Sequence, residues 1–411
     1  MKKPYETLDK VFDIFPELYG NCDGQKDRYE KLFSDFKRDF GVNAGYFVSS
    51  PGRVEICGNH VDHNGGSVIS AAIDKDTLAV FMPNDSTVIK IKSEGYDDIL
   101  IDSDKDEKVK KGTSAALVKG VCIALKNMGF KVGGFNALVC SDVLGGAGIS
   151  SSASFEVLIA EIINFLFNDG KITEKDKAIA AQYAEKEIFG KPCGLLDQTA
   201  IAYGGLNLLD FSVKGEIKVS KARDGLKDYS LVLINTGGSH ENLTDEYASI
   251  PVEMRSVAAF FGKDRLIEVK EKDFYGKIKE LSERVSDRAI LRAIHFYSEN
   301  KRVISAFDDL SGGNYGGFIS AINESGLSSL AFLQNCYVSG SKDQPIVKAV
   351  ALSKKYNVNG ATRVHGGGFA GTVLNIISKK KTQAFIDNMR VFYDEKDVIM
   401  LNVRNSGTKV L

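Results

Sequence analysis

Apolar residues recur at helical spacing in several segments of the chain and alternate with polar residues, or form short runs, in others. The helical pattern is clearest in residues 151–167, where Leu158, Ile159, Ile162 and Leu166 share one face. Helices are also predicted at residues 26–40, 173–189, 252–305 and 346–356, and strands at residues 45–51, 67–72, 77–82, 87–92, 134–140, 229–235, 361–364 and 372–377. This mixture predicts an α+β fold in which helices cover the sheets on one side.

The charge balance and the cysteines narrow the functional classes. The 411 residues carry 53 basic and 54 acidic side chains, so no overall basic surface attracts nucleic acid. No run approaches the roughly 20 apolar residues of a membrane span, and the N-terminus lacks the apolar segment of a secretory signal. The six cysteines are scattered without a Cys-x-x-Cys pair, which indicates reduced thiols. We therefore expect a cytoplasmic protein that binds neither nucleic acid nor membrane, of an oligomeric state that the sequence leaves open.

The first candidate site is a polar segment at residues 50–66, Ser-Pro-Gly-Arg-Val-Glu-Ile-Cys-Gly-Asn-His-Val-Asp-His-Asn-Gly-Gly. It brings Arg53, Asn59, His60 and Asp62 together between two apolar strands. Guanidinium, amide, imidazole and carboxylate groups make directional hydrogen bonds to hydroxyls, which suits a polyhydroxylated ligand. A polar turn that caps its own backbone would have the same composition.

The same segment also allows a metal site. His60, Asp62 and His63 match the second half of the His-x-His-x-Asp-His pattern of metallo-β-lactamase-like hydrolases. Gly58 stands where the first histidine of that pattern would be, and the remaining histidines form no ligand-like pair. A zinc hydrolase is therefore the weaker interpretation.

The second candidate site directly precedes the strongest helix. Residues 142–154 read Asp-Val-Leu-Gly-Gly-Ala-Gly-Ile-Ser-Ser-Ser-Ala-Ser. Glycines let backbone amides turn toward a ligand, and a helix N-terminus attracts anions. The segment is neither a Walker A loop nor a dinucleotide-binding fingerprint. It predicts a phosphate-binding loop formed by Gly145, Gly146, Gly148, Ser150, Ser151 and Ser152. A serine that caps the helix after a glycine-rich turn would share part of this pattern.

A third glycine-rich segment lies near the C-terminus. Residues 360–372 read Gly-Ala-Thr-Arg-Val-His-Gly-Gly-Gly-Phe-Ala-Gly-Thr, between two predicted strands. Its backbone is accessible to a ligand, although a flexible turn has the same pattern.

The three segments, in this order, resemble the three motifs of the GHMP sugar kinases. The first resembles the galactokinase signature P-G-R-V-N-L-I-G-E-H-T-D-Y-N, the second that family's G-A-G-L-S-S-S-A-S, and the third its G-G-G-F-G-G. Residues 189–198 (Phe-Gly-Lys-Pro-Cys-Gly-Leu-Leu-Asp-Gln) resemble G-x-x-C-G-I-M-D-Q, and residues 244–247 (Thr-Asp-Glu-Tyr) resemble S-S-E-Y. The resemblance implies the two-domain GHMP architecture, with an N-terminal domain at 1–205, a C-terminal domain at 206–411 and the active site between them.

The resemblance also implies which residues act. Asp197 matches the catalytic aspartate and Arg53 the arginine that faces it, so Asp197 would orient or deprotonate the sugar O1 hydroxyl. Ser152 and Glu185 match the Mg²⁺ ligands, with ATP as the co-substrate. His60, Asp62 and Tyr247 match residues of the sugar pocket.

The first segment departs from the family signature. Asn59 replaces the glutamate before the histidine, Glu55 the asparagine, His63 the tyrosine and Cys57 an isoleucine-like position. In the family that glutamate reaches the 6-hydroxyl of the sugar, so Asn59 is expected to face this region and to tolerate other groups there.

The favoured function is an ATP-dependent kinase that phosphorylates the C1 hydroxyl of galactose. The alternatives are the same chemistry on N-acetylgalactosamine, L-arabinose or a uronic acid, and a non-catalytic sugar sensor. Such sensors lose part of the serine loop or the catalytic aspartate, whereas Ser150–Ser154 and Asp197 are present here.

Overall fold

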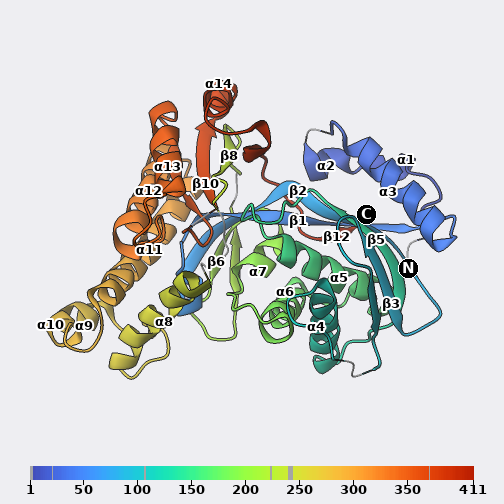
Figure 1. The fold of residues 1–411 in the computed structure, drawn as a ribbon, viewed down its shortest axis with the longest axis horizontal. Helices are drawn as coiled ribbons and strands as arrows, with labels where there is room; N and C mark the ends of the chain where they lie inside the picture. The colour runs from blue at the N-terminus through green and yellow to red at the C-terminus, as the bar shows by residue number, and fades with distance from the viewer. Residues whose placement is uncertain (1–2, 21, 106–107, 223–224, 239–243, 370) are drawn as a thin grey trace.

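The computed structural model describes residues 3–20, 22–105, 108–222, 225–238, 244–369 and 371–411. The strands are β1 (Tyr46–Cys57), β2 (Ser67–Pro83), β3 (Val88–Ser93), β4 (Ile99–Asp102), β5 (Phe135–Ser141), β6 (Leu206–Asp210), β7 (Lys218–Lys221), β8 (Tyr229–Asn235), β9 (Ala361–His365), β10 (Thr372–Ser378), β11 (Val398–Leu401) and β12 (Lys409–Val410). They form two sheets, and helices lie against both of them (Figure 1).

The helices surround both sheets. The α-helices are α1 (Asp9–Phe12), α2 (Phe15–Tyr19), α3 (Gln25–Phe40), α4 (Ser114–Asn127), α5 (Ser151–Phe167), α6 (Glu174–Tyr183), α7 (Leu196–Tyr203), α8 (Thr244–Phe260), α9 (Glu271–Gly276), α10 (Ile278–Leu281), α11 (Asp287–Ser311), α12 (Tyr315–Ser328), α13 (Pro345–Tyr356) and α14 (Lys379–Met389). Shorter 3₁₀ or π turns are η1 (Asp62–Asn64), η2 (Ala184–Phe189), η3 (Leu266–Glu268), η4 (Ser329–Leu333) and η5 (Glu395–Asp397).

The larger sheet has the strand order β12-β1-β2-β5-β3-β4, and β6 and β7 continue from the other end of β2. All its pairs are antiparallel except β3 with β5. Successive residues of a strand point to opposite faces. Phe47 accordingly packs on α1–α3, whereas Tyr46 and Val48 pack on α4–α6.

The smaller sheet has the antiparallel order β11-β8-β10-β9. Helices cover both of its faces as well. Leu231 and Leu233 of β8 face α11 and α12, and Val232 and Ile234 face α13 and α14. The expectation that helices cover the sheets on one side is therefore wrong for both sheets. The strands read as apolar runs because both of their faces are buried.

Most predicted elements are confirmed. Helix α5 and strand β8 have the predicted bounds, and Thr173 and Asp176 form the capping box that starts α6. The strands predicted at 67–72 and 77–82 are one strand, β2. Between the two predicted ranges, Asp74 accepts hydrogen bonds from Asn402 at 2.7 and 3.0 Å and Asp76 pairs with Arg28.

The division into domains at residue 205 stays a prediction. Strands β6, β7 and β12 lie C-terminal to that residue, yet they belong to the larger sheet, where β6 pairs with β2, β12 pairs with β1 and β7 pairs with β6. Within the described part of the chain, no helix combines the length and the apolar character needed to cross a membrane.

Candidate active site

The catalytic pair predicted from the sequence is formed in the structure. Arg53, on β1, donates from Nε to Oδ1 of Asp197 at 2.7 Å, and its Nη2 lies at the same distance. Asp197 is in the first turn of α7, and Ser150 donates to its other oxygen at 2.5 Å. Burial alone would raise the pKa of Asp197, but the charge of Arg53 and these hydrogen bonds hold it below its ordinary value. The carboxylate is therefore ionised at neutral pH.

The phosphate loop approaches this pair from the start of α5. Gly148 has a φ of 70°, and its carbonyl accepts a hydrogen bond from Arg53 Nη1 at 2.5 Å. A Cβ at Gly148 would lie 3.1 Å from Thr372 and 3.3 Å from His365, both at the ends of the strands that flank the third segment. Three segments distant in sequence therefore meet at Gly148. Gly145 and Gly146 have open space beside them.

Ser150 connects the loop to the Arg53–Asp197 pair. It precedes α5 with a φ of 65°, and its side chain does not cap the helix but donates to Asp197. Ser151 and Ser152 begin the helix itself, where backbone amides point toward the loop.

Oxygen atoms gather beside the loop at the predicted metal ligands. Ser152 Oγ donates to Glu185 Oε1 at 2.8 Å, and Lys191 Nζ lies 2.9 Å from the same oxygen. Gln198 donates to the other oxygen of Glu185 at 2.9 Å and lies 3.4 Å from Glu156. Burial, reinforced by the charge of Glu185, raises the pKa of Glu156 well above its ordinary value.

The sugar-motif loop follows β1 and carries His60 and Asp62. His60 has a φ of 57° and donates from Nε2 to the carbonyl of Gly367 at 3.0 Å, which joins the first segment to the third. Asp62 lies against Gly194, where a Cβ would come within 1.8 Å of its carboxylate. Burial, with the nearby charges of Glu55 and Asp197, raises the pKa of Asp62 to about 7.

Tyr247 and Asn335 pack closely against two glycines of the third segment. Its hydroxyl donates to the carbonyl of Gly368 at 2.7 Å, and its ring lies 2.1 Å from where a Cβ of Gly367 would be. A Cβ at Gly368 would meet the backbone oxygen of Asn335 at 2.1 Å. These glycines admit neighbouring groups of the protein, which is a packing reason for the motif.

Asn59 is placed differently from the expectation that it faces the sugar. Its side chain has no exposed surface. Its amide nitrogen donates to Glu55 Oε1 at 2.9 Å and to the carbonyl of Gly366 at 2.7 Å, and its oxygen accepts from Asn335 at 2.7 Å. The protein itself therefore takes up the hydrogen-bonding groups of this amide.

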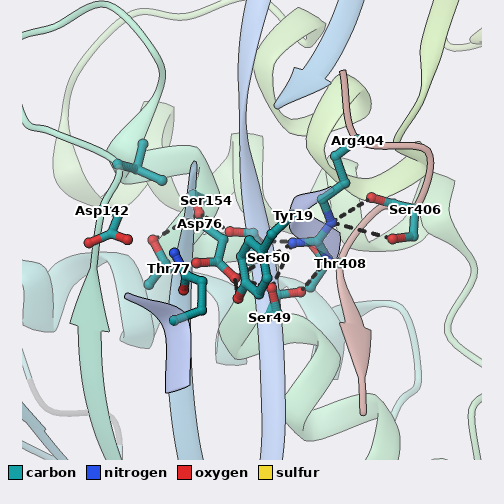
Figure 2. Close-up of polar contacts among 12 residues, drawn as sticks. Tyr19, Ser49, Ser50, Asp76, Thr77, Asp142, Ser154, Arg404, Ser406 and Thr408 are labelled. Carbon is teal, nitrogen blue, oxygen red and sulfur yellow. Dashed lines mark hydrogen bonds and ion pairs between the residues drawn. The ribbon is translucent and has the colours of Figure 1, made fainter. Parts of the chain in front are cut away.

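A buried ionic network around Asp76 is joined to Asp142, the first residue of the glycine-serine segment (Figure 2). Asp76, on β2, accepts from Tyr19 at 2.7 Å and from Arg28 at 2.6 Å, and Arg404 lies 3.6 Å away. The backbone oxygen of Asp76 accepts from the amide of Asp142, the first residue of the loop segment. Burial would raise the pKa of Asp76, but the charges of Arg28 and Arg404 hold this pKa below its ordinary value.

The other end of the loop segment is fixed to the same strands. Ser154 donates to the carbonyl of Ser50 at 2.8 Å and to Thr77 at 2.9 Å (Figure 2). Both ends of the glycine-serine segment are therefore tied to the β1–β2 pair.

In the described part of the chain, no zinc site supports the hydrolase interpretation. Among the residues described, no group of three His, Cys, Asp or Glu side chains is arranged to hold a metal ion. The Nε2 atom of His60 donates to a carbonyl, and His63 lies against Asn64 at 2.8 Å.

The chain matches two family models and several named relatives. The family model described as "Galactokinase galactose-binding signature" matches residues 34–83, and the model of the GHMP kinases N terminal domain matches residues 112–205. The galactokinase of Pyrococcus furiosus is 31% identical over 349 residues, which cover 83% of this chain and 91% of the relative. The chain belongs to the galactokinase family.

Two further matches agree. The galactokinase of Clostridium tetani is 29% identical over 359 residues, covering 86% of this chain and 90% of the relative. The crystal structure of Lactococcus lactis galactokinase complexed with galactose superposes with a TM-score of 0.80 at 23% identity, covering 93% of this chain and all of that one. The galactokinase fold therefore extends over nearly the whole chain, and the GHMP kinase architecture expected from the motifs is confirmed.

Several residues around the site were not predicted from the sequence. Lys191, Gln198 and Glu156 surround Glu185, and Glu299 and Arg363 lie behind the sugar-motif loop. Lys191 and Gln198 lie within or beside the Asp197 segment, so that segment could have drawn attention to them. Arg363 lies within the third glycine-rich segment, but its partner Glu55 is more than 200 residues away, and Glu299 has no local signal because its partner Gly58 is equally distant.

Proposed function

We propose that this member of the galactokinase family transfers the γ-phosphoryl group of ATP to the C1 hydroxyl of galactose, which gives galactose 1-phosphate. The observation that carries the proposal is the Arg53–Asp197 pair, at 2.7 Å, beside a glycine-serine loop at a helix N-terminus and a loop rich in sugar-binding groups. The galactokinases of Clostridium tetani and Pyrococcus furiosus match this chain over 90% and 91% of their own length.

Asp197 orients the attacking hydroxyl. Because its pKa is lowered, it is a weak base toward a ground-state alcohol, and we assign it to accept a hydrogen bond from the C1 hydroxyl. The proton passes to it as the O–P bond forms and the hydroxyl becomes acidic. Arg53 keeps the carboxylate ionised and lies where negative charge on the migrating phosphoryl group needs to be offset. Ser150 fixes the second carboxylate oxygen and so the direction of the first.

The loop from Gly145 to Ser152 is assigned to the ATP phosphates. Its glycines leave room for close approach, and the amides at the start of α5 favour anions. Ser152 and Glu185 are suited to hold Mg²⁺, since they offer hard oxygen donors beside buried, unpartnered oxygens of Glu156 and Gln198 among the described residues. When bound, Mg²⁺ supplies positive charge that neutralises phosphate oxygens.

His60, Asp62 and Tyr247 are assigned to the sugar pocket. Asp62 carries a partly exposed carboxylate, which suits hydrogen bonds from sugar hydroxyls. Asn59 is withdrawn from direct contact in this proposal, because its amide is buried and fully engaged. Asn59 therefore gives no reason to prefer L-arabinose or a uronic acid, which differ from galactose at C6, and galactose is the favoured substrate.

A cytoplasmic location is also proposed. It is supported by the six cysteines, which are free thiols.

The test is a panel of sugars with ATP and Mg²⁺, read as ADP release. D-galactose, N-acetylgalactosamine, L-arabinose and galacturonic acid are compared by kcat/KM, and the product is located by phosphorus NMR. We expect galactose to have the highest kcat/KM and phosphate on C1. Another sugar with a higher value would replace galactose as the substrate, and no ADP release with any of them would favour the sensor interpretation.

A further inference from the structure

Glu55 and Asn59 form one buried hydrogen-bonded pair at the back of the sugar-motif loop. Asn59 Nδ2 donates to Glu55 Oε1 at 2.9 Å, and Arg363 donates to the same oxygen at 2.9 Å. Asn59 and Arg363 are fully buried, and Glu55 is 4% exposed. Since both donors share one carboxylate oxygen, the amide of position 59 and the guanidinium of position 363 are close neighbours.

The two residues that form this pair are also two of the departures from the signature. The signature has asparagine where Glu55 stands and glutamate where Asn59 stands. Each position therefore carries the kind of group that the signature has at the other, and the structure places the two in direct contact.

We propose that Glu55 and Asn59 are a compensated exchange, in which a carboxylate and an amide have traded places across one hydrogen bond. In this proposal the pair positions the loop that carries His60 and does not read the sugar itself. The inference deepens the proposed function and rests on it for its kinetic test.

The charge at this site explains why the exchange has to be reciprocal. Arg363 is buried and pairs with Glu55, with the charge of Glu299 also nearby, and the exchange leaves one carboxylate in the 55–59 pair whichever position carries it. A carboxylate at position 59 alone would meet Glu55 and the carbonyl of Gly366, which are both acceptors. An amide at position 55 would restore a donor to that contact.

The pair is connected to His60 through the backbone of the loop. Glu299, on α11, accepts from the amide of Gly58 at 3.0 Å and from that of Asn59 at 3.4 Å. His295 donates to the carbonyl of Asn59 at 2.9 Å. With the two residues before it held in this way, His60 keeps its left-handed backbone conformation and its bond to Gly367. A shift at position 59 therefore moves His60.

The test is a double-mutant cycle with a size control. The variants are Glu55→Asn, Asn59→Glu and the double variant, and Asn59→Gln adds the same length without the charge. kcat and KM for galactose and for ATP are measured, together with the urea midpoint of unfolding, which does not depend on activity.

Asn59→Glu is expected to lower kcat/KM for galactose at least about tenfold more than Asn59→Gln does, and the double variant to recover at least about tenfold over Asn59→Glu. The KM for ATP should change by less than about threefold, because the phosphate loop is held by other contacts. The urea midpoint should show coupling of the same sign.

Losses that simply multiply in the double variant would overturn the proposal, as would an Asn59→Glu variant no worse than Asn59→Gln. If Asn59→Glu does not fold, the double variant must fold, and a double variant that also fails to fold contradicts the exchange. If the wild-type chain proves inactive on galactose, the proposed function fails, while the unfolding cycle still decides whether the exchange is compensated.

Discussion

The phosphate loop and the sugar-motif loop are both supported by buried carboxylates, but from different parts of the chain. Asp76 supports the phosphate loop from within the larger sheet, with Arg28 and Arg404 as its partners. Glu55 and Glu299 support the sugar-motif loop by contacts with β9 and α11, which lie in the C-terminal half.

This difference corresponds to where the sequence departs from its family. The glycine-serine segment keeps most residues of the family's second motif. The sugar-motif loop departs at several positions, and two departures meet in one hydrogen bond. Glu55 and Asn59 lie in one charged cluster with Arg363, so a change at either position alters the partners of the other.

The largest expected effect is on the catalytic pair that both loops adjoin. Asp197→Asn removes the charge but keeps the shape, so kcat should fall by about 10²–10⁴, with a much smaller change in KM. Asp210→Asn serves as the control, because that carboxylate belongs to β6 and was not placed in the site. A variant that retains more than about a tenth of wild-type kcat would remove Asp197 from the mechanism.

Asp76→Asn tests the support of the phosphate loop. It leaves Arg28 and Arg404 without their buried counter-charge, which should lower the free energy of unfolding by about 3–5 kcal/mol. Because the folded-state pKa of Asp76 is lowered, its stabilisation is present above the ordinary aspartate range and is lost as the pH falls through the folded pKa. The wild type should therefore lose more stability on acidification than the variant.

Urea unfolding at pH 7 and at acid pH measures both effects. Asp142→Asn is the control, since Asp142 also pairs with Arg28 but its side chain is 38% exposed, and its loss should be at most about 1 kcal/mol. Equal losses for the two variants would contradict the special role of Asp76.

Glu185→Gln tests the metal assignment on the phosphate side. We expect the Mg²⁺ concentration for half-maximal rate to rise by about tenfold or more, because a charged oxygen ligand is lost. Glu187→Gln, two residues along the same turn and 50% exposed, should leave it unchanged. An unchanged Mg²⁺ dependence in Glu185→Gln would show that this residue is not a ligand.

The smallest effect concerns pH on the sugar side. Burial raises the pKa of Asp62 to about 7, so the free protein loses stability as the pH rises from the ordinary aspartate range to about 7, and the carboxylate is ionised above that pH. Sugar hydroxyls that donate to the carboxylate favour the ionised form, so KM for galactose should fall by up to about tenfold between pH 6 and pH 8.

Initial rates over this pH range give the profile. Asp62→Asn should have a weaker affinity for galactose that no longer follows this titration. A wild-type KM that is constant from pH 6 to pH 8 would mean that galactose binding is not coupled to the protonation of Asp62.

The sequence predicted the local features well, and it missed those that depend on distant partners. Helix α5 and the capping box of α6 depend on neighbouring residues, so their patterns sufficed. The continuity of β2 was missed because Asp74 and Asp76 look like turn residues until Asn402 and Arg28 are known. The resemblance predicted that Arg53 faces Asp197, and the two side chains form an ion pair, while their catalytic role stays a prediction.

Asn59 shows the limit of motif transfer. Its position in the signature predicts a contact with the sugar, but hydrogen-bond partners at positions 335 and 366 enclose its side chain. No pattern within residues 50–66 reveals those partners, because they approach from another part of the fold.

The most direct test of the central claim, attack by the C1 hydroxyl held by Asp197, compares galactose with 1-deoxygalactose, which lacks that hydroxyl. We predict ADP release that depends on galactose, and none with 1-deoxygalactose, which should still bind as a competitive inhibitor against galactose through the rest of the pocket. Phosphorylation of 1-deoxygalactose at a rate comparable to that of galactose would contradict the assignment of Asp197 to the C1 hydroxyl.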